Sequence, residues 1–454
     1  MWETNIAINI CTFKREPFVI RNIDILHSSI IDHPDNPLYG HLQIYISDNG
    51  KSLPKQRLNN ETVHIVENKN VGGAGGFARG LIEIMHNSEK FAATHALMMD
   101  DDVIIEPEAL FRTYSLLRCR KQEYADLFVG GAMLRLDNQA IQVESGASWN
   151  AGKLVSNKSA WDLRKLDLCL LNEHEEYVEY NAWWYCCTPM QVVTSDNLPL
   201  PIFIRGDDLE YGLRNMKHLA LMNGICVWHE AFENKYSSFL QYYILRNLLY
   251  DNSLHFENYK LGEFLVRLYK NVIREIVYYR YKNVALIFRG VKDFLKGVEF
   301  LKTTDGEVLH QQIMEKGYKA MPVDQLEGVA FRIDDYENSM EESENKVQKL
   351  WRFITLNGYL LPTKKLSENH MKVVSMAQCR PINFYRAKQV LNYDPASKKG
   401  FVTKRSWRQT IGIGFELIGM TVEIMMHFTK AKREFKKDVV QITNESFWEK
   451  YLSM

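Results

Sequence analysis

An apolar stretch that ends in three consecutive aspartates constrains the fold of this chain most. Residues 96–99 (Ala-Leu-Met-Met) are followed directly by Asp100, Asp101 and Asp102. Such a run predicts a buried strand that ends at the edge of a sheet. Because consecutive strand side chains point to opposite faces, Asp100 and Asp102 are expected on one side and Asp101 on the other. Two carboxylates that close repel each other unless a cation lies between them. The pattern therefore predicts a divalent-metal site, with a solvated acidic turn as the alternative.

The segments around this stretch alternate between strand and helix patterns. Apolar runs predict strands over residues 6–10, 42–47 and 63–66, and apolar residues at helical spacing predict helices after Pro17 and over 74–86. Strands that alternate with helices are typical of an α/β fold with a doubly wound, mostly parallel sheet, whose ligands bind at the carboxyl ends of the strands. We expect such a sheet, followed by a mainly helical C-terminal region.

Polar residues stand where the first two strands end. Thr12 and Arg15 follow the first strand, and Asp48 follows the second. The carboxyl ends of parallel strands meet at one edge of a sheet. We therefore expect these three side chains to share one site with the aspartates at 100–102.

Length and charge limit what else the chain can be. With 454 residues it is too long for one ordinary domain, and we divide it into residues 1–235, 236–300 and 301–454. Lys and Arg balance Asp and Glu at 56 each, so no overall basicity indicates a nucleic-acid partner. The seven cysteines form no Cys-x-x-Cys pair, and no basic segment with an apolar core opens the chain. Both features favour a cytoplasmic protein without a secretory signal.

A glycine-rich segment, residues 70–80, joins the third predicted strand to its helix. Glycines let backbone N–H groups approach a phosphate, a helix N-terminus favours an anion, and Arg79 is placed to pair with a phosphate oxygen. Residues 73–78 also fit the dinucleotide pattern G-x-G-x-x-A, with Asp100 about twenty residues later. Against that alternative, these glycines follow the third strand rather than the first, after the polar stretch 67–70.

A second acidic stretch begins another predicted helix. Asp207 and Glu210 have the spacing of a capping box. This leaves Asp208 on the first turn, where the helix N-terminus holds a carboxylate ionised. We predict that Asp208 is a general base, with simple complementarity to the helix dipole as the alternative.

A histidine and two tryptophans complete the candidate site. His229 is a plausible third metal ligand beside the Asp-x-Asp pair, although a lone histidine is more often a core residue. Trp183 and Trp184 favour core packing, and their functional interpretation is a platform for sugar rings.

Residues 411–428 are apolar, interrupted only by Glu416 and Glu423, and basic residues flank them within 398–437. An apolar helix with basic flanks is typical of peripheral contact with an anionic membrane, here the inner face of the cell membrane. The alternative is packing on the catalytic domain or on a partner subunit of a homo-oligomer. Residues 307–349 are charged and weakly periodic, which predicts surface helices or a linker.

In their order along the chain these residues resemble an inverting glycosyltransferase of family two, with the GT-A fold. The resemblance covers roughly residues 5–252 and includes Tyr242-Tyr243 to Arg246-Asn247. The glycine-rich segment and Trp183-Trp184 are most similar to galactofuranosyltransferases of bacterial polysaccharide assembly. The resemblance implies a UDP-galactofuranose donor, a glycan or lipid-linked glycan acceptor and a Mn²⁺ or Mg²⁺ cofactor.

The resemblance also implies a role for each matching residue. Thr12 and Asp48 would hold the uracil, Arg79 would contact the diphosphate and Asp208 would be the base. The metal ligands would be Asp100, Asp102 and His229; the nucleotide sugar would also meet Arg15, Asn70, Gly72, Gly76, Asp101 and Asp207; and the sugar or acceptor would meet Trp183, Trp184, Glu210 and Arg246.

We therefore predict a metal-dependent inverting glycosyltransferase that uses a UDP-sugar, with a galactofuranosyltransferase favoured. The alternative in the same class is a rhamnosyltransferase that uses dTDP-rhamnose. Alternatives in other classes are an NAD-dependent oxidoreductase and a non-catalytic sugar-binding subunit.

Overall fold

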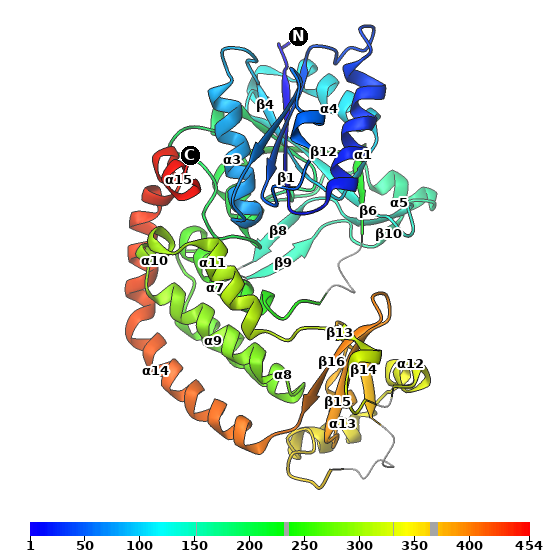
Figure 1. Ribbon diagram of the computed structural model, residues 1–454, viewed down its shortest axis with the longest axis vertical. Coiled ribbons are helices and arrows are strands. Elements are labelled where there is room, and N and C mark those ends of the chain that lie inside the picture. Colours follow the sequence, from blue (N-terminus) through cyan, green and yellow to red (C-terminus); the bar gives the residue numbers. More distant parts are fainter. Residues whose placement is uncertain (151, 231–235, 330, 364–370) are drawn as a thin grey trace.

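The computed structural model describes residues 1–150, 152–230, 236–329, 331–363 and 371–454. A large α/β unit at the N-terminal end is joined to a group of helices, and a smaller sheet lies beyond them (Figure 1). The long helix α14 (Trp407–Asp438) curves along one side and returns the chain to the first unit. The predicted division after residue 235 falls on 231–235, outside the described residues.

The large sheet confirms the predicted α/β class. Its strand order is β10-β7-β6-β11-β4-β1-β2-β3, and β12 pairs with β5 and β6. The longer ladders, which join β1 to β2 and β4, β2 to β3, and β6 to β12, are parallel, whereas β11 runs antiparallel between β4 and β6. The strands are β1 (Ile6–Thr12), β2 (Leu42–Asp48), β3 (Val63–Glu67), β4 (His95–Asp100), β5 (Ile104–Ile105), β6 (Leu127–Arg135), β7 (Ile141–Glu144), β10 (Trp161–Asp162), β11 (Cys186–Pro189) and β12 (His218–His229).

Helices cover both faces of this sheet because its strands are apolar on both sides. Ile8 and Leu97 belong to a core with α1 and α4, while their neighbours Ala7 and Ala96 belong to a core with α3 on the opposite face. A short hairpin, β8–β9, extends from the edge towards the helical group. The elements are α1 (Glu16–Leu26), continued by a π-helical turn (His27–Ile31), α2 (Lys55–Leu58), α3 (Gly72–His86), α4 (Pro107–Cys119), α5 (Leu166–Leu171), α6 (Asp207–Asn215), β8 (Ala147–Asn150) and β9 (Lys153–Ser156).

The helical group has its own core, to which α14 contributes one face. Leu417, Ile424 and Phe428 are buried among side chains of the preceding helices. The last helix then packs on α3, where Trp448 is fully buried and its indole N–H donates to the carbonyl of Pro199. The helices are α7 (Leu240–His255), α8 (Leu261–Val277), α9 (Tyr281–Leu295), α10 (Val298–Thr303), α11 (Gly306–Lys316) and α15 (Glu445–Leu452).

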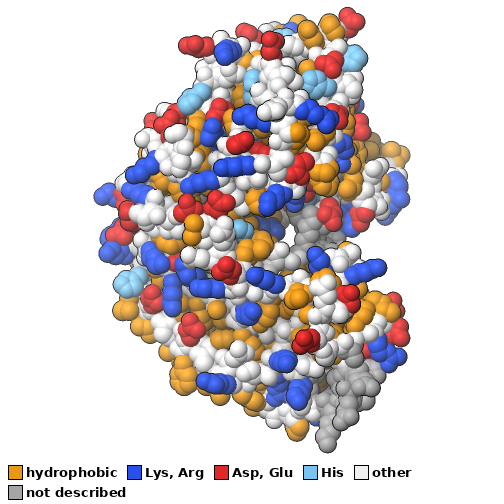
Figure 2. Space-filling model, viewed as in Figure 1, with side chains coloured by type: hydrophobic (Ala, Val, Ile, Leu, Met, Phe, Trp, Pro, Cys, Tyr) orange, Lys and Arg blue, Asp and Glu red, His pale blue; other side chains and the backbone are white. Residues whose placement is uncertain are grey.

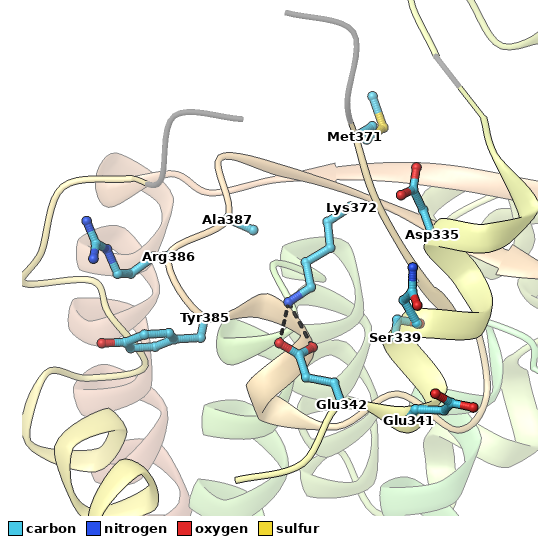
Figure 3. A pocket seen from close by; sticks show the side chains of 10 residues that line it. Asp335, Ser339, Glu341, Glu342, Met371, Lys372, Tyr385, Arg386 and Ala387 are labelled. Atoms are coloured by element: carbon cyan, nitrogen blue, oxygen red, sulfur yellow. Dashed lines mark hydrogen bonds and ion pairs between the residues drawn. The ribbon is translucent and has the colours of Figure 1, made fainter. Parts of the chain in front are cut away.

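The helical C-terminal region contains a small sheet that the sequence analysis did not anticipate. Its strand order is β13-β16-β15-β14. Beside it, Lys372 forms an ion pair with Glu342 (2.9 Å) at a pocket of about 450 Å³ (Figure 3). The elements are β13 (Met321–Pro322), β14 (Lys372–Ser375), β15 (Gln389–Asp394), β16 (Lys399–Lys404), α12 (Ile333–Glu341) and α13 (Lys346–Ile354).

Candidate active site

Asp100, Asp102 and His229 come together at the carboxyl edge of the large sheet. Asp100 ends β4 and His229 ends β12. One ligand atom from each of the three residues lies within 4.8 Å of the others, and His229 Nε2 is 3.0 Å from Asp102 Oδ1. Two carboxylates and an imidazole at this spacing suit Mn²⁺ or a similar ion.

The protonation of these groups favours a cation between them. His229 Nδ1 lies 2.6 Å from the carbonyl oxygen of Glu230, which can only accept, so Nδ1 donates. In the neutral ring, Nε2 then directs its lone pair at the Asp102 carboxylate, as a metal-binding histidine would. Burial, followed by repulsion from Asp102, raises the pKa of Asp100 to about 7.

Asp101, in the turn after β4, stands outside this three-residue cluster, as the sequence predicts. Its carboxylate accepts hydrogen bonds from the Thr12 hydroxyl (2.7 Å) and from the Arg15 guanidinium (3.0 Å). Arg15 also contacts Asp102 at 2.5 Å. Thr12 and Arg15 therefore fix the turn that carries the candidate metal ligands. Their predicted contacts with the nucleotide stay a prediction.

Asp48 organises the loop that follows β2. Its carboxylate accepts from the backbone N–H groups of Gly50, Ser52 and Leu53 at 2.7 to 3.0 Å, and the side chain is buried. A carboxylate that already accepts three backbone hydrogen bonds has little capacity left to accept another from the N–H group of uracil. The structure thus favours a loop-forming role over the predicted hydrogen bond to uracil.

The glycine-rich segment serves the packing of α3 on β1. A Cβ atom on Gly76 would lie 2.1 Å from Cys11 Sγ, and one on Gly80 would lie 1.9 Å from Asn9 Oδ1. Gly72 has a positive φ of 71° and abuts the carbonyl of Phe203. These positions need glycine because helix and strand backbones approach closely.

Two polar residues of this segment are also engaged within the protein. Asn70 Oδ1 accepts from the backbone N–H of Gly72 at 3.3 Å. The Arg79 guanidinium pairs with Glu83 at 2.8 Å, one turn further along α3. In this structure Arg79 therefore serves the helix rather than the acidic cluster. The glycine that faces the acids is Gly73, where a Cβ would lie 3.2 Å from Asp207 Oδ2.

The predicted capping box at α6 is wrong. The N-cap residue is Gly206, with φ 94°, and no side chain caps the helix. Glu210 is instead fully buried between Arg214 (2.8 Å) and His255 (3.1 Å). Because internal ion pairs satisfy Glu210, its predicted contact with the acceptor is not supported.

Asp208 lies on the first turn of α6, as predicted. Burial raises its pKa, which its hydrogen bond from the backbone N–H of Leu209 (2.8 Å) and the charge of Arg205 partly offset. Burial and the adjacent Asp208 raise the pKa of Asp207 to about 8. A buried carboxylate with a raised pKa is suited to accept a proton.

Arg246 supports the loop before α6 and does not face an acceptor. The side chain is 1% exposed, and its guanidinium donates to the carbonyl of Ile202 at 2.6 Å. Asn247 donates to the carbonyls of Ile204 and Arg205 at 2.7 Å. The loop needs this support because Phe203, Arg205 and Gly206 all have positive φ, which is unfavourable for the first two. The predicted acceptor role of Arg246 is therefore corrected to a positioning role.

Trp183 and Trp184 lie in the core, which matches the packing interpretation. Trp183 packs edge-on against Phe77 and Tyr211, and the Trp184 indole N–H donates to the carbonyl of Gly131. They are 4% and 7% exposed. A sugar platform needs an accessible ring face, so neither indole supplies one in this structure.

Three charged residues around Asp208 were not predicted from the sequence. Arg205 lies on the loop before α6, and its positive charge lowers the pKa of Asp208. Glu144 and Asp251 are buried carboxyls whose pKa values are raised by burial and by the nearby charge of Asp208. The one available signal was that Asp251 directly follows the apolar residues 248–250; Glu144 carried none.

No protein-family model matches the chain. Two curated proteins are similar to it: galactofuranosyltransferase GlfT2 of Mycolicibacterium smegmatis, 29% identical over 328 residues, and that of Mycobacterium tuberculosis, 28% identical over 330 residues. The matches cover 66% and 65% of this chain and 48% and 49% of those proteins. The chain thus spans about half the length of these curated relatives.

The solved structures that match the chain include two of S. aureus TarS 1-349, one with UDP, at TM-scores of 0.36 and 0.38. Each covers 71% of this chain and 95% of TarS 1-349. The mannosyltransferase PcManGT of Pyrobaculum calidifontis, in complex with GDP-Man and Mn²⁺, has a TM-score of 0.34 and covers 55% of this chain and 63% of that chain. All three are 11% identical to this chain.

The α/β sheet with its acidic carboxyl edge and the sequence matches are similar to those of one class, the glycosyltransferases with a GT-A-type fold. Within that class, the chain is similar in sequence to two bacterial galactofuranosyltransferases, the resemblance that the sequence motifs predicted.

Proposed function

We propose that this chain is a metal-dependent, inverting glycosyltransferase that transfers galactofuranose from UDP-galactofuranose to a glycan or lipid-linked glycan. The observation that carries the proposal is the convergence of Asp100, Asp102 and His229, with Asp208 on an adjacent helix N-terminus. The sequence relatives support the choice of sugar.

Asp100, Asp102 and His229 fit a divalent cation because they offer two oxygens and one nitrogen within a single coordination sphere. A bound Mn²⁺ or Mg²⁺ would supply Lewis acidity for a departing nucleoside diphosphate. Arg15 neutralises part of the remaining negative charge, since it pairs with both Asp101 and Asp102. The dense negative charge here would otherwise repel a diphosphate.

Asp208 is the base of the proposed mechanism. Its carboxylate takes the proton of the acceptor hydroxyl while that oxygen attacks the anomeric carbon from the face opposite the leaving group. One displacement inverts the configuration, and no covalent nucleophile is needed. The short α6 and the loop at 203–206 hold Asp208 in place, supported by Asn247.

The test is Asp208→Asn, measured as sugar transfer to a synthetic galactofuranosyl acceptor with UDP-galactofuranose and Mn²⁺. We expect transfer to fall about 1,000-fold, the scale of a lost general base, while UDP still raises the melting temperature. The matched control is Asp167→Asn on the exposed surface of α5, which should leave transfer unchanged. Retained turnover in Asp208→Asn would contradict the assignment, and turnover of dTDP-rhamnose in place of UDP-galactofuranose would contradict the donor.

A further inference from the structure

A polar pocket of about 540 Å³ opens between three segments that are far apart in the sequence. The residue before the glycine-rich segment, the junction of α10 and α11, and helix α15 all contribute to its lining. Lys69, Lys302 and Lys450 line it, together with hydroxyl and amide side chains and the rings of Phe447 and Tyr451. Its volume lies within the range of small-molecule sites, about 300 to 1,000 Å³. None of the residues of the candidate active site lines this α10–α15 pocket.

Lys69 is held over the floor of the pocket by two contacts. Its Nζ lies 4.7 Å from the centroid of the Tyr451 ring and 3.4 Å from Asp305 Oδ2. The other oxygen of Asp305 caps helix α11, where it accepts from the backbone N–H groups of Glu307 and Val308 at 2.9 and 3.1 Å. Asp305 is therefore shared between the helix cap and Lys69, and it leaves the other lysines of the pocket without a carboxylate partner inside it.

The two remaining lysines have little counter-charge. Lys302, on α10, donates to the side-chain oxygen of Gln441 and lies 4.0 Å from Glu299, whose side chain is 71% exposed. Such an exposed and distant pair contributes little. Lys450, on α15, is exposed and forms no ion pair with any residue that the structure describes. Both ammonium groups can therefore accept an anionic partner.

The charge of the pocket is positive although the chain as a whole is neutral. Three lysines face one carboxylate in its lining, whereas Lys and Arg equal Asp and Glu over the whole sequence. The acids of α15 do not compensate, because Glu445 and Glu449 lie with His86 on the side of the helix that faces α3. Figure 2 shows Lys and Arg side chains gathered along the left edge, where Figure 1 places α10 and α15.

We propose that the α10–α15 pocket binds the phosphate groups of a small ligand, as an anion site separate from the candidate active site. A lysine ammonium binds phosphate as a point charge, and three of them converge here from different elements. The hydroxyls of Thr304 and Ser446 add hydrogen-bond donors. Phe447 and Tyr451 stack with ring centroids 5.3 Å apart and form an apolar wall for the rest of the ligand.

Without metal, the candidate active site is a poor competitor for such an anion. Five aspartates gather there: Asp100, Asp101, Asp102, Asp207 and Asp208. The guanidinium of Arg15 is already paired with two of them, Asp101 and Asp102. Like charges at close range repel an incoming phosphate. Anion binding in the presence of a chelator therefore reports on the lysine pocket.

The test is calorimetric titration of the full-length chain with inorganic pyrophosphate in EDTA at low ionic strength. We expect one site per chain, with an affinity that falls as NaCl is added. Lys302→Gln and Lys450→Gln should each lower the affinity about tenfold, the scale of one hydrogen bond to a charged group. Because Lys450 makes no ion pair among the described residues, its variant should keep the fold even if Lys302→Gln weakens the contact with Gln441.

The matched control is Lys90→Gln, Lys165→Gln, which removes two exposed lysines of the first unit that form no ion pair with described residues and should bind as the parent does. Arg15→Gln should also leave the affinity unchanged, and thermal unfolding establishes that each variant is folded. The absence of binding by the parent, or equal affinities of the parent and Lys450→Gln, would overturn the proposal. Loss of binding in Arg15→Gln would overturn it as well, since the anion would then lie in the candidate active site. No sugar nucleotide is used, so the outcome is independent of the proposed transfer reaction.

Discussion

Two regions of the large sheet were expected to serve the same nucleotide diphosphate, and the fold uses them differently. At the end of β4, Asp100 and Asp102 converge with His229 from a distant strand. At the start of α3, Gly76 and Gly80 face β1 at distances that exclude any side chain. The difference teaches that a run of acids at a strand end has few structural explanations. A run of glycines at a helix start has a common one, close packing.

Gly80→Ala tests the packing half of this comparison and should have the largest effect on stability. A methyl group there would overlap Asn9 Oδ1, whose side chain is fully buried on β1 and is held by its hydrogen bond to the carbonyl of Phe77 (2.9 Å). We expect the free energy of unfolding to fall by about 3 kcal/mol, the upper range for overpacking, measured by urea denaturation. Gly262→Ala is the control, because no atom lies within 4 Å of its added Cβ. Equal stability of Gly80→Ala and Gly262→Ala would contradict the packing role and favour phosphate binding by the glycine-rich segment.

Glu144→Gln tests the acidic region of this comparison through the pH dependence of stability. Burial raises the pKa of Glu144 to about 7 from its ordinary value of about 4.5. Its folded pKa is the higher one, so its stabilising contribution is complete below about pH 4.5 and is lost as pH rises through 7. The parent should therefore lose about 2 kcal/mol between pH 5 and pH 8 relative to Glu144→Gln. Parallel stability curves for the two proteins across this range would contradict the account.

Much of the site followed from local pattern, because the rules involved act over a few residues. The Asp-x-Asp spacing predicted that Asp100 and Asp102 lie together with Asp101 outside the pair, and the run of parallel strands predicted Thr12 beside these acids. The predicted roles of Arg246 and Trp184 depended on which side chains become buried by distant parts of the chain. The spacing of neighbouring residues does not show which side chains distant segments will bury. The four-stranded sheet was missed because β13 (Met321–Pro322) and β14 (Lys372–Ser375) are short and lie far apart in the sequence.

Arg79→Ala should have the smallest effect on stability, and it tests whether the first half of α3 also contacts the diphosphate. Since the guanidinium pairs with Glu83 on the same helix, its loss should cost about 0.5 kcal/mol of stability. The affinity for UDP, measured by calorimetry with Mn²⁺ present, should change less than about twofold. A tenfold loss of UDP affinity would show that Arg79 leaves Glu83 for the diphosphate, as the sequence resemblance implied.

Titration of Mn²⁺ into the UDP-bound protein tests the central claim most directly. We expect one site per chain, and an affinity at least about 100-fold lower in His229→Ala, since loss of a group that merely orients a ligand already costs 10- to 100-fold. The control is His86→Ala, because His86, Glu445 and Glu449 also lie within 4.8 Å of one another but on the side of α3 and α15. Unchanged Mn²⁺ affinity in His229→Ala, or its loss in His86→Ala, would contradict the account.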